Sequence, residues 1–357
     1  MVHKILTINP GSTSTKIGLF QDTTEVFVQS ITHSSDDIAK FPFVIDQFEY
    51  RLENIAAFLS KQNVSVSGLS AIVARGGLLK PMVSGTYQIN AAMLDDLKHS
   101  RYGAHASNLG ALIADKLATE GGCPAYIVDP VVVDELAPVA RLSGRPELTR
   151  KSIFHALNHK AVAKRFAKTI NRSYEDLNLI IAHLGGGISV ACHTSGNAVD
   201  VNNCLNGEGP FSPERAGTLP AKQFADKILA EKLDINTISS QLAGKAGLVA
   251  YLGTTDVREV ERRIAEGDQQ AELVYNAMVY TIAKSIGAAA IPVRGKVDYI
   301  ILTGGIAYSE QLTAKLKEYV SFIAPVVILP GENELQALAE GAYRVLISEE
   351  IAKEYQG

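Results

Sequence analysis

The chain has 357 residues, of which 46% are hydrophobic and 20% are charged, with 29 glycines and 13 prolines. This length predicts about two domains, and the composition excludes a disordered chain, a collagen-like protein and a disulfide scaffold. The net charge of −4 gives no general attraction to nucleic acid or anionic membranes, and no apolar run is long enough for a transmembrane helix.

Three segments share one pattern, a short apolar run followed by a polar turn that contains glycine. They are Lys4–Phe20, Leu179–His193 and Tyr299–Ala307. In the first two segments the apolar run resumes after the turn, which predicts a β-hairpin. In the third, apolar residues then recur at helical spacing, which predicts a strand, a turn and a helix. The turns fall in both halves of the chain, as expected if both halves present backbone to one ligand.

Helices and short strands alternate between these turns. Amphipathic spacing predicts helices over Phe48–Gln62, Ala91–Leu97, His105–Glu120, Lys151–Thr169, Ala221–Lys232, Asp256–Gly267, Ala271–Ala290 and Leu335–Glu354. Strands are predicted over Ala71–Ala74, Ala125–Val128 and Val326–Leu329. This alternation indicates an α/β fold, and the loop Arg141–Thr149 is a plausible domain boundary.

The first turn, Asn9–Lys16, contains four hydroxyl side chains, one glycine and one lysine. Backbone N–H groups and hydroxyls in such a turn can bind an anion, and Lys16 would add a positive charge. Asn9 could hold a metal-bound water. An ordinary surface hairpin would explain the serines and threonines equally well. The turn is not a Walker A loop, because it precedes a strand and not a helix.

The second turn, His183–Gly187, places three consecutive glycines inside an apolar hairpin. Glycines carry an entropic cost there, and close approach of the backbone to a ligand would account for them. A bulge or a tight hairpin is the alternative. Gly304 and Gly305, which precede a predicted helix, would admit a nucleotide or would only permit close packing.

Four charged residues stand out beside these turns or at the ends of apolar runs, namely Arg75, Asp129, His155 and Arg215. Charged groups in such positions often point into a functional cleft. Taken one at a time, each has a more ordinary explanation: a solvated cap for an arginine, a structural role for a histidine, and turn capping for Asp129 ahead of Pro130.

Taken together, these segments resemble the acetokinase family, within the superfamily of acetate kinases, sugar kinases, Hsp70 and actin. The resemblance covers nearly the whole chain and rests on the order and spacing of several motifs. These are I-N-P-G-S-T-S-T-K at Ile8–Lys16, A-R-G-G-L-L at Ala74–Leu79, V-D-P at Val128–Pro130, F-H-A-L-N-H at Phe154–His159, H-L-G-G-G at His183–Gly187, G-E-G-P-F-S-P-E-R-A-G at Gly207–Gly217 and G-E-N-E-L-Q-A-L-A-E-G at Gly331–Gly341.

The resemblance implies an actin-like ATPase (ribonuclease H-like) fold. Two duplicated α/β domains, with mixed β-sheets of five core strands flanked by helices, would border an ATP cleft. Residues 1–149 and 333–357 would form the N-terminal domain. Residues 150–332 would form the C-terminal domain, which would bind the nucleotide and make the dimer contact.

The implied activity is reversible, ATP-dependent phosphorylation of a short-chain carboxylic acid, with Mg²⁺ as a further cofactor. The segment Gly207–Arg215 and the short chain favour butyrate or branched C4–C5 acids. An acetate or propionate kinase is the alternative within this class. An ATPase module of the Hsp70 or actin type is the alternative outside it, although such a module needs no acid-binding cluster like Arg75, His155 and Arg215.

The resemblance also implies roles for individual residues. The catalytic set is Asp129, His155, Arg215 and Arg75, and Arg75 would also bind the acid. Asn9 and Glu334 resemble the metal site, although this chain reads Glu332-Asn333-Glu334 where acetate kinases have two adjacent glutamates. The nucleotide-binding residues would be Ser12, Ser14, Lys16, His183, Gly185, Gly186, Gly187, Asp256, Arg258, Gly304 and Gly305.

The expected partners are small molecules and further copies of the chain. The resemblance implies the acid, ATP and ADP, and a homodimer or higher homo-oligomer, with no nucleic acid or membrane partner. The three cysteines, Cys123, Cys192 and Cys204, form no C-x-x-C pair and no zinc-type spacing with histidine. Reduced, structural cysteines agree with a cytoplasmic location.

Overall fold

The computed structural model describes residues 2–357, which form two compact units. Unit 1 contains the chain up to Val133 together with Asn333–Gly357, and unit 2 is Asp134–Glu332. The first boundary therefore lies ahead of the boundary at 149/150 suggested by the sequence. Its position follows from contacts of residues just after Asp134, because the Ala137 N–H donates to the Val199 carbonyl within unit 2 (2.8 Å).

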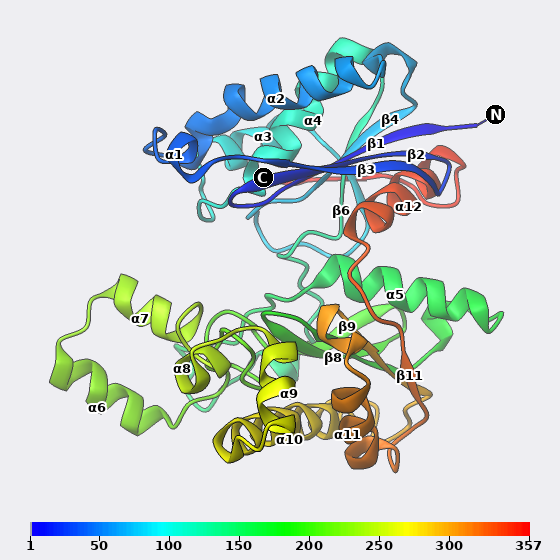
Figure 1. Ribbon diagram of the computed structural model, residues 1–357. Helices are drawn as coiled ribbons and strands as arrows, with labels where there is room; N and C mark the ends of the chain where they lie inside the picture. Colours follow the sequence, from blue (N-terminus) through cyan, green and yellow to red (C-terminus); the bar gives the residue numbers. More distant parts are fainter. Residues whose placement is uncertain (1) are drawn as a thin grey trace. The chain divides into compact units, whose positions relative to one another are not determined.

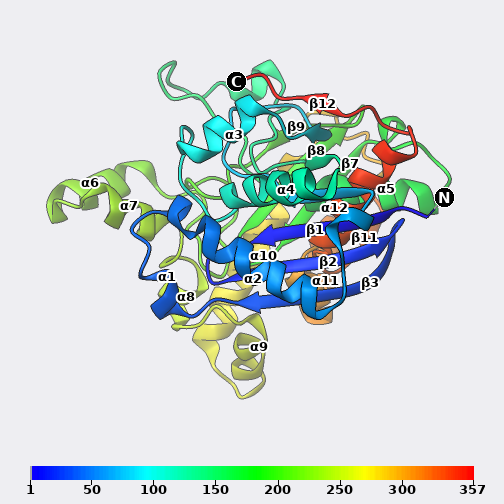
Figure 2. The same ribbon diagram turned by 90° about the horizontal axis from the view of Figure 1, so that it is seen from above.

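Unit 1 is built on a mixed seven-stranded sheet, ordered β12-β5-β6-β4-β1-β2-β3. The first three strands form an antiparallel meander, and β4 and β6 extend the sheet in parallel. Figure 2 shows β1, β2 and β3 lying side by side. The strands are β1 (Lys4–Pro10), β2 (Ser14–Gln21), β3 (Thr24–Thr32), β4 (Ala71–Arg75), β5 (Thr86–Gln88), β6 (Ala125–Val128) and β12 (Lys353–Glu354).

Helices cover both faces of this sheet, with α2 and α4 on one face and α12 on the other (Figure 1). Local sequence sets the ends of these helices: Asn90 caps α3 by accepting from the Met93 N–H, and Gly122 ends α4 in a left-handed conformation (φ 68°). The helices of unit 1 are α1 (Ser35–Ile38), α2 (Phe48–Lys61), α3 (Ala91–Lys98), α4 (Asn108–Gly121) and α12 (Glu334–Leu346).

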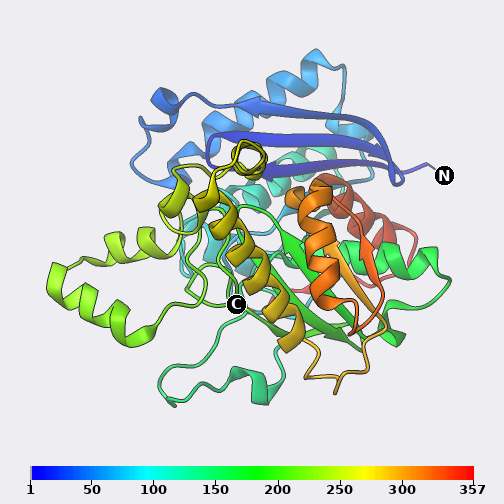
Figure 3. The ribbon, with the colours of Figure 1, turned by 60° about the horizontal axis from the view of Figure 1, so that its bottom comes forward.

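Unit 2 is built on a five-stranded sheet, ordered β11-β10-β7-β8-β9. Figure 3 shows α10 and α11 packed side by side, whereas α6 and α7 stand apart from the sheet and bury none of their residues. The strands are β7 (Leu179–Leu184), β8 (Ile188–Thr194), β9 (Asn197–Val201), β10 (Tyr299–Thr303) and β11 (Val326–Ile328). The helices are α5 (Ala156–Thr169), α6 (Ala221–Glu231), α7 (Ile235–Leu242), α8 (Leu248–Leu252), α9 (Val257–Ala265), α10 (Gln269–Ala288) and α11 (Glu310–Val320).

The two sheets share one connectivity. In each, the first strand pairs antiparallel with the second, and the second pairs antiparallel with the third. The first strand also pairs parallel with the fourth, which pairs parallel with one more strand, β6 in unit 1 and β11 in unit 2. This repetition confirms the duplicated α/β architecture with mixed sheets. Unit 1 departs from the expected five strands only at one edge, where β5 and β12 are added.

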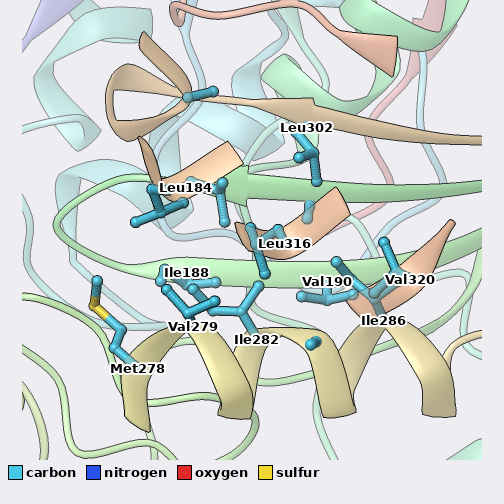
Figure 4. Close-up of a cluster of buried hydrophobic side chains, with 14 of the residues drawn as sticks. Leu184, Ile188, Val190, Met278, Val279, Ile282, Ile286, Leu302, Leu316 and Val320 are labelled. Carbon is cyan, nitrogen blue, oxygen red and sulfur yellow. The ribbon is translucent and has the colours of Figure 1, made fainter. Parts of the chain in front are cut away.

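The core of unit 2 follows from the two-residue period of β7. Ile180, Ala182 and Leu184 face one side and pack in the cluster formed with α10 and α11. Leu179 and Ile181 face the other side, against α5. Figure 4 shows Met278, Val279, Ile282 and Ile286 of α10 directed toward Ile188 and Val190 of β8. A continuous apolar run thus becomes a strand that is buried on both faces.

Most predicted helices differ from the structure by three residues or fewer at either end, and two differ by more. The helix expected over Lys151–Thr169 begins only at Ala156, because His155 is its N-cap residue. The helix expected over Leu335–Glu354 ends at Leu346. Ser348 then adopts a left-handed conformation (φ 60°), which no helix continues through, and the tail forms β12 beside β5.

Two properties of the described chain bear on its surroundings. Across residues 2–357, no helix has both the length and the hydropathy needed to cross a bilayer. Cys123, Cys192 and Cys204 are all free thiols.

Candidate functional site

In unit 1, the β1–β2 turn presents the serines of the first motif. Ser12 is exposed, Ser14 is partly exposed at the start of β2, and Lys16 is exposed opposite Asn9 in the antiparallel register. The Gly11 N–H donates to the Ser14 carbonyl (2.8 Å) and closes the turn. The turn therefore offers hydroxyls and one ammonium group in a small space.

Asn9, Arg75 and Glu334 meet at the carboxyl ends of β1 and β4. Asn9 Nδ2 donates to Glu334 Oε2 (2.6 Å), and Arg75 Nη1 lies 3.2 Å from Glu334 Oε1. The parallel pairing of β1 and β4 brings Asn9 and Arg75 to one edge of the sheet. Glu334, the first residue of α12, therefore lies beside Asn9 within unit 1.

Asp129 directly follows β6 and is buried, with a positive φ of 40°. Its Oδ1 accepts from the Gly85 N–H (2.7 Å), and its own N–H donates to the Gly85 carbonyl (3.1 Å). The carboxylate is thus anchored to backbone on the loop that leads into β5.

In unit 2, His155 and His183 stack with their ring centroids 3.8 Å apart. His183 Nδ1 lies 3.0 Å from Asn158 Oδ1, and His183 Nε2 lies 3.3 Å from Glu332 Oε1. Asn158 also donates to the Glu332 carbonyl (3.2 Å). One histidine at the start of α5 and one at the end of β7 therefore form a fixed pair.

Behind this pair runs a buried hydrogen-bonded chain. Ser189 Oγ lies 2.8 Å from His155 Nδ1 and 3.0 Å from His159 Nε2. His159 Nδ1 lies 3.2 Å from His193 Nε2, and Tyr174 Oη lies 2.7 Å from His193 Nδ1. The chain links the partly exposed His155 to the interior of unit 2.

Burial keeps the inner histidines of this chain neutral. Desolvation and the nearby His193 hold the pKa of His159 well below its usual value. Desolvation, together with the positive charge of Lys160, lowers the pKa of His193 to about 3. Two neutral rings therefore orient the Ser189 hydroxyl against His155.

The triple glycine has a geometric reason at each of its last two positions. A Cβ added at Gly187 would lie 1.8 Å from Arg215 Nη1, so the guanidinium occupies the space of a side chain. A Cβ at Gly186 would lie 3.1 Å from Glu214 Oε1. The Gly186 carbonyl accepts from Ser212 Oγ (2.5 Å), and the Arg215 Nη1 donates to the Cys204 carbonyl (2.9 Å). The glycines thus bring the 212–215 segment onto the hairpin.

The remaining predicted nucleotide residues lie at two other turns of unit 2. Gly304 adopts φ 88°, and a Cβ there would lie 2.4 Å from the Leu184 carbonyl oxygen, whereas Gly305 faces open space. Asp256 caps α9 by accepting from the Arg258 N–H (2.9 Å), and its carboxylate pairs with the exposed Arg258 side chain (2.7 Å). Hydrogen bonds to Arg258 lower the pKa of Asp256 to about 2.

Sequence reasoning missed several polar residues beside the predicted set. The hydrogen-bonded chain adds Ser189, His159 and His193, and a fully buried Arg51 lies behind the β1–β2 turn. A signal existed for His159, because residues four apart share one face of a helix and His155 begins α5. No comparable signal marks the others.

A cavity of about 470 Å³ in unit 2 is lined by none of the predicted residues. Arg150, Asp200 and Glu208 supply its charges, and the Arg150 guanidinium already pairs with both carboxylates (2.8 and 3.1 Å). The charged side chains that line this cavity are therefore already engaged with one another.

Comparisons with known proteins agree with one another. The sequence profile of the Acetokinase family matches residues 141–352. Butyrate kinase 2 of Clostridium acetobutylicum is 52% identical over 356 residues, covering 100% of both chains. Two solved structures have a TM-score of 0.75. The acetate kinase of Porphyromonas gingivalis is 20% identical, and the match covers 95% of this chain and 99% of that chain. The propionate kinase of Francisella tularensis is 19% identical, and the match covers 95% of this chain and 98% of that chain. These structures confirm the predicted actin-like ATPase fold.

Proposed function

The chain belongs to the acetokinase family, and from this we propose that it transfers the γ-phosphoryl group of ATP to a short-chain carboxylate. The product is an acyl phosphate, and the reaction is reversible. The observation that carries the proposal is the 52% identity along the full length of a butyrate kinase. Butyrate or a branched C4–C5 acid is therefore the proposed substrate.

This chemistry asks little of a general base. A carboxylic acid with a pKa of about 4.3 is already ionised at neutral pH, so the nucleophile is ready. The site must align two anions and neutralise the charge on the phosphoryl group as it passes between them. Clusters of cationic and N–H donor groups meet that need better than a proton acceptor does.

In unit 1, Arg75 is the proposed ligand of the acid. One of its N–H groups pairs with Glu334, and a guanidinium has five, so donors remain for a carboxylate. Asn9 and Glu334 fit Mg²⁺, since this ion takes oxygen ligands and is held by one or two carboxylates with water and phosphate. When bound, the ion would neutralise charge on the phosphates of the nucleotide.

Asp129 is proposed to act as a fixed negative charge that holds a cationic group or a metal-bound water. Its anchoring by the Gly85 N–H supports a positioning role. Lys16 and the hydroxyls of Ser12 and Ser14 are proposed to bind phosphate oxygens, because they are accessible donors at one turn.

In unit 2, His155 and Arg215 are proposed to stabilise the charge of the transferred phosphoryl group. Arg215 is held against Gly187, and His155 is oriented by Ser189. Both side chains are therefore positioned before the substrate binds. His183 and the backbone of Gly185–Gly187 are proposed to face the nucleotide phosphates. Gly304, Gly305, Asp256 and Arg258 are proposed to border the nucleoside.

The preferred length of the acyl chain depends on small differences in binding free energy. One methylene contributes only about 1–3 kcal/mol of discrimination, so neighbouring acids are expected to react at reduced rates. An acetate or propionate kinase remains the second candidate, supported by the likeness of fold to both kinds of enzyme.

Trapping with hydroxylamine tests the proposal. The purified chain is incubated with Mg-ATP and a panel of acids from acetate to hexanoate, including branched C4 and C5 acids. Hydroxamate that requires ATP and is greatest with a C4 or C5 acid is expected. If the hydroxamate yield is greatest with acetate, the second candidate function is correct. ATP hydrolysis without hydroxamate would contradict the proposed kinase activity.

A further inference from the structure

A guanidinium lies buried directly behind the β1–β2 turn. Arg51, on α2, has no exposed surface. Its Nη1 donates to the carbonyls of Gly11 (2.9 Å) and Ser14 (3.2 Å), and its Nη2 donates to the carbonyl of Ser12 (2.9 Å). Nη1 also donates to Thr15 Oγ1 (3.1 Å). One side chain thus binds four of the five positions from Gly11 to Thr15 from the inner side of the turn.

This cation has no anionic partner. Throughout residues 2–357, no carboxylate forms an ion pair with Arg51, and its other contacts go to the neutral Gln47 Oε1 (3.0 and 2.9 Å). Burial lowers the pKa of Arg51, but a guanidinium remains protonated at neutral pH. A buried charge without a counter-ion is costly, and buried charges in proteins are normally paired.

The carbonyl groups of the turn are engaged in hydrogen bonds, whereas several of its N–H groups are not. Arg51 takes the carbonyls of Gly11, Ser12 and Ser14, and the His33 N–H takes the carbonyl of Thr13 (2.8 Å). In the described part of the chain, by contrast, the N–H groups of Ser12 and Thr13 and their hydroxyls have no partner. With its backbone carbonyls occupied and its backbone N–H groups open, the turn presents hydrogen-bond donors to an anion.

We propose that Arg51 is a positioning residue for the phosphates of the nucleotide. It withdraws the carbonyls of the turn from the ligand, fixes the turn so that its donors face outward, and gains its missing counter-charge when a di- or triphosphate binds. The inference rests on the proposed function, because it takes the anion at this turn to be the phosphate chain of ATP or ADP.

Isothermal titration of adenosine and of Mg-ADP tests this role in the full chain. Arg51→Met removes the charge at similar size, Arg51→Lys keeps a charge without the fork of donors, and Arg262→Met is a matched control on the exposed Arg262–Glu266 pair of α9. For Arg51→Met the Kd of Mg-ADP is expected to rise about tenfold or more, with the Kd of adenosine unchanged. The Kd of Mg-ADP for Arg51→Lys should lie between the values for Arg51→Met and for the unaltered chain.

The outcomes separate positioning from a purely structural role. If adenosine and Mg-ADP weaken alike, or if neither changes, Arg51 only supports the fold and the inference is overturned. Should Arg51→Met not fold, the ADP-to-adenosine comparison in Arg51→Lys decides. A chain that makes no acyl hydroxamate, yet shows the phosphate-specific loss, would contradict the proposed kinase and leave the role of Arg51 intact.

Discussion

Asp129 occupies a backbone conformation that a non-glycine residue adopts at a cost. Its φ of 40° lies in the left-handed region, and such strain persists where surrounding contacts fix it. The two hydrogen bonds to Gly85 supply that fixation. The strain and the burial agree with a residue whose carboxylate must stay in one place.

The charge of Asp129 can be separated from its anchoring. Asp129→Asn keeps an oxygen for the Gly85 N–H, and asparagine tolerates a left-handed φ. We expect kcat to fall about 100-fold or more, as is typical when one electrostatic group of a transition state is lost, with the unfolding temperature little changed. Steady-state kinetics at saturating Mg²⁺ measure this, and a near-normal kcat would exclude a charge role.

Gly187 is predicted to matter because the Arg215 guanidinium occupies the space that a side chain would take. Gly187→Ala would place a methyl group 1.8 Å from Nη1 and 2.2 Å from Cζ of Arg215, so the guanidinium must leave. We expect kcat/KM for the acid to fall about 100-fold, comparable with loss of a transition-state donor.

The control is Gly68→Ala, where no atom lies within 4 Å of the added group. It should change neither activity nor stability. If Gly187→Ala is equally silent, Arg215 has no role that depends on this position.

At the scale of elements, the C-terminal tail of unit 1 supports the loop that holds Asp129. Glu350 Oε1 accepts from the Thr86 N–H (2.7 Å), and Lys353 donates to the Ser84 carbonyl. Gly85 lies between Ser84 and Thr86 in the chain, and its N–H donates a hydrogen bond to Asp129. The C-terminal tail thus holds the residues on both sides of Gly85, which anchors Asp129.

This arrangement predicts different results for two adjacent glutamates. Glu350→Ala leaves the Thr86 N–H and the Arg344 guanidinium without this partner, so the free energy of unfolding should fall by about 1–3 kcal/mol. Glu349→Ala removes an exposed side chain and should be neutral. Urea unfolding of both variants compares them, and equal stability would show that the tail contributes nothing through Glu350.

At the scale of the whole molecule, buried neutral histidines make stability depend on pH. His159 and His193 have folded pKa values below the unfolded value near 6.5, so their contribution is complete above that value. It is lost as the pH falls from 6.5 toward the folded pKa, which is about 3 for His193. Inside that window, each such histidine lowers the free energy of unfolding by about 1.4 kcal/mol for each unit that the pH falls.

Urea unfolding between about pH 7 and pH 5 measures this slope. The unaltered chain should lose stability steadily as the pH falls, because burial also lowers the pKa values of His33 and His105. His193→Asn removes one titrating group and should reduce the slope by about one proton. An unchanged slope in the variant would mean that His193 is protonated in the fold.

The sequence by itself determined the local parts of this protein. The three glycine-containing turns and the helix–strand alternation could be predicted, because turn chemistry and apolar periodicity are properties of neighbouring residues. The sequence also indicated Arg75 at the end of a strand and Asp129 directly after one. The motif order was enough to indicate the family. The roles of the individual residues stay predictions, since they concern ligands.

Only the tertiary structure decided which distant residues meet. Glu334 lies beside Asn9 although 325 positions separate them, and Arg51 lies behind a turn 40 positions earlier. The tail after Leu346 leaves the helical pattern because strand pairing with β5 and the Thr86–Glu350 bond are available to it. Such contacts depend on the packing of whole sheets and helices, and no short stretch of sequence contains that information.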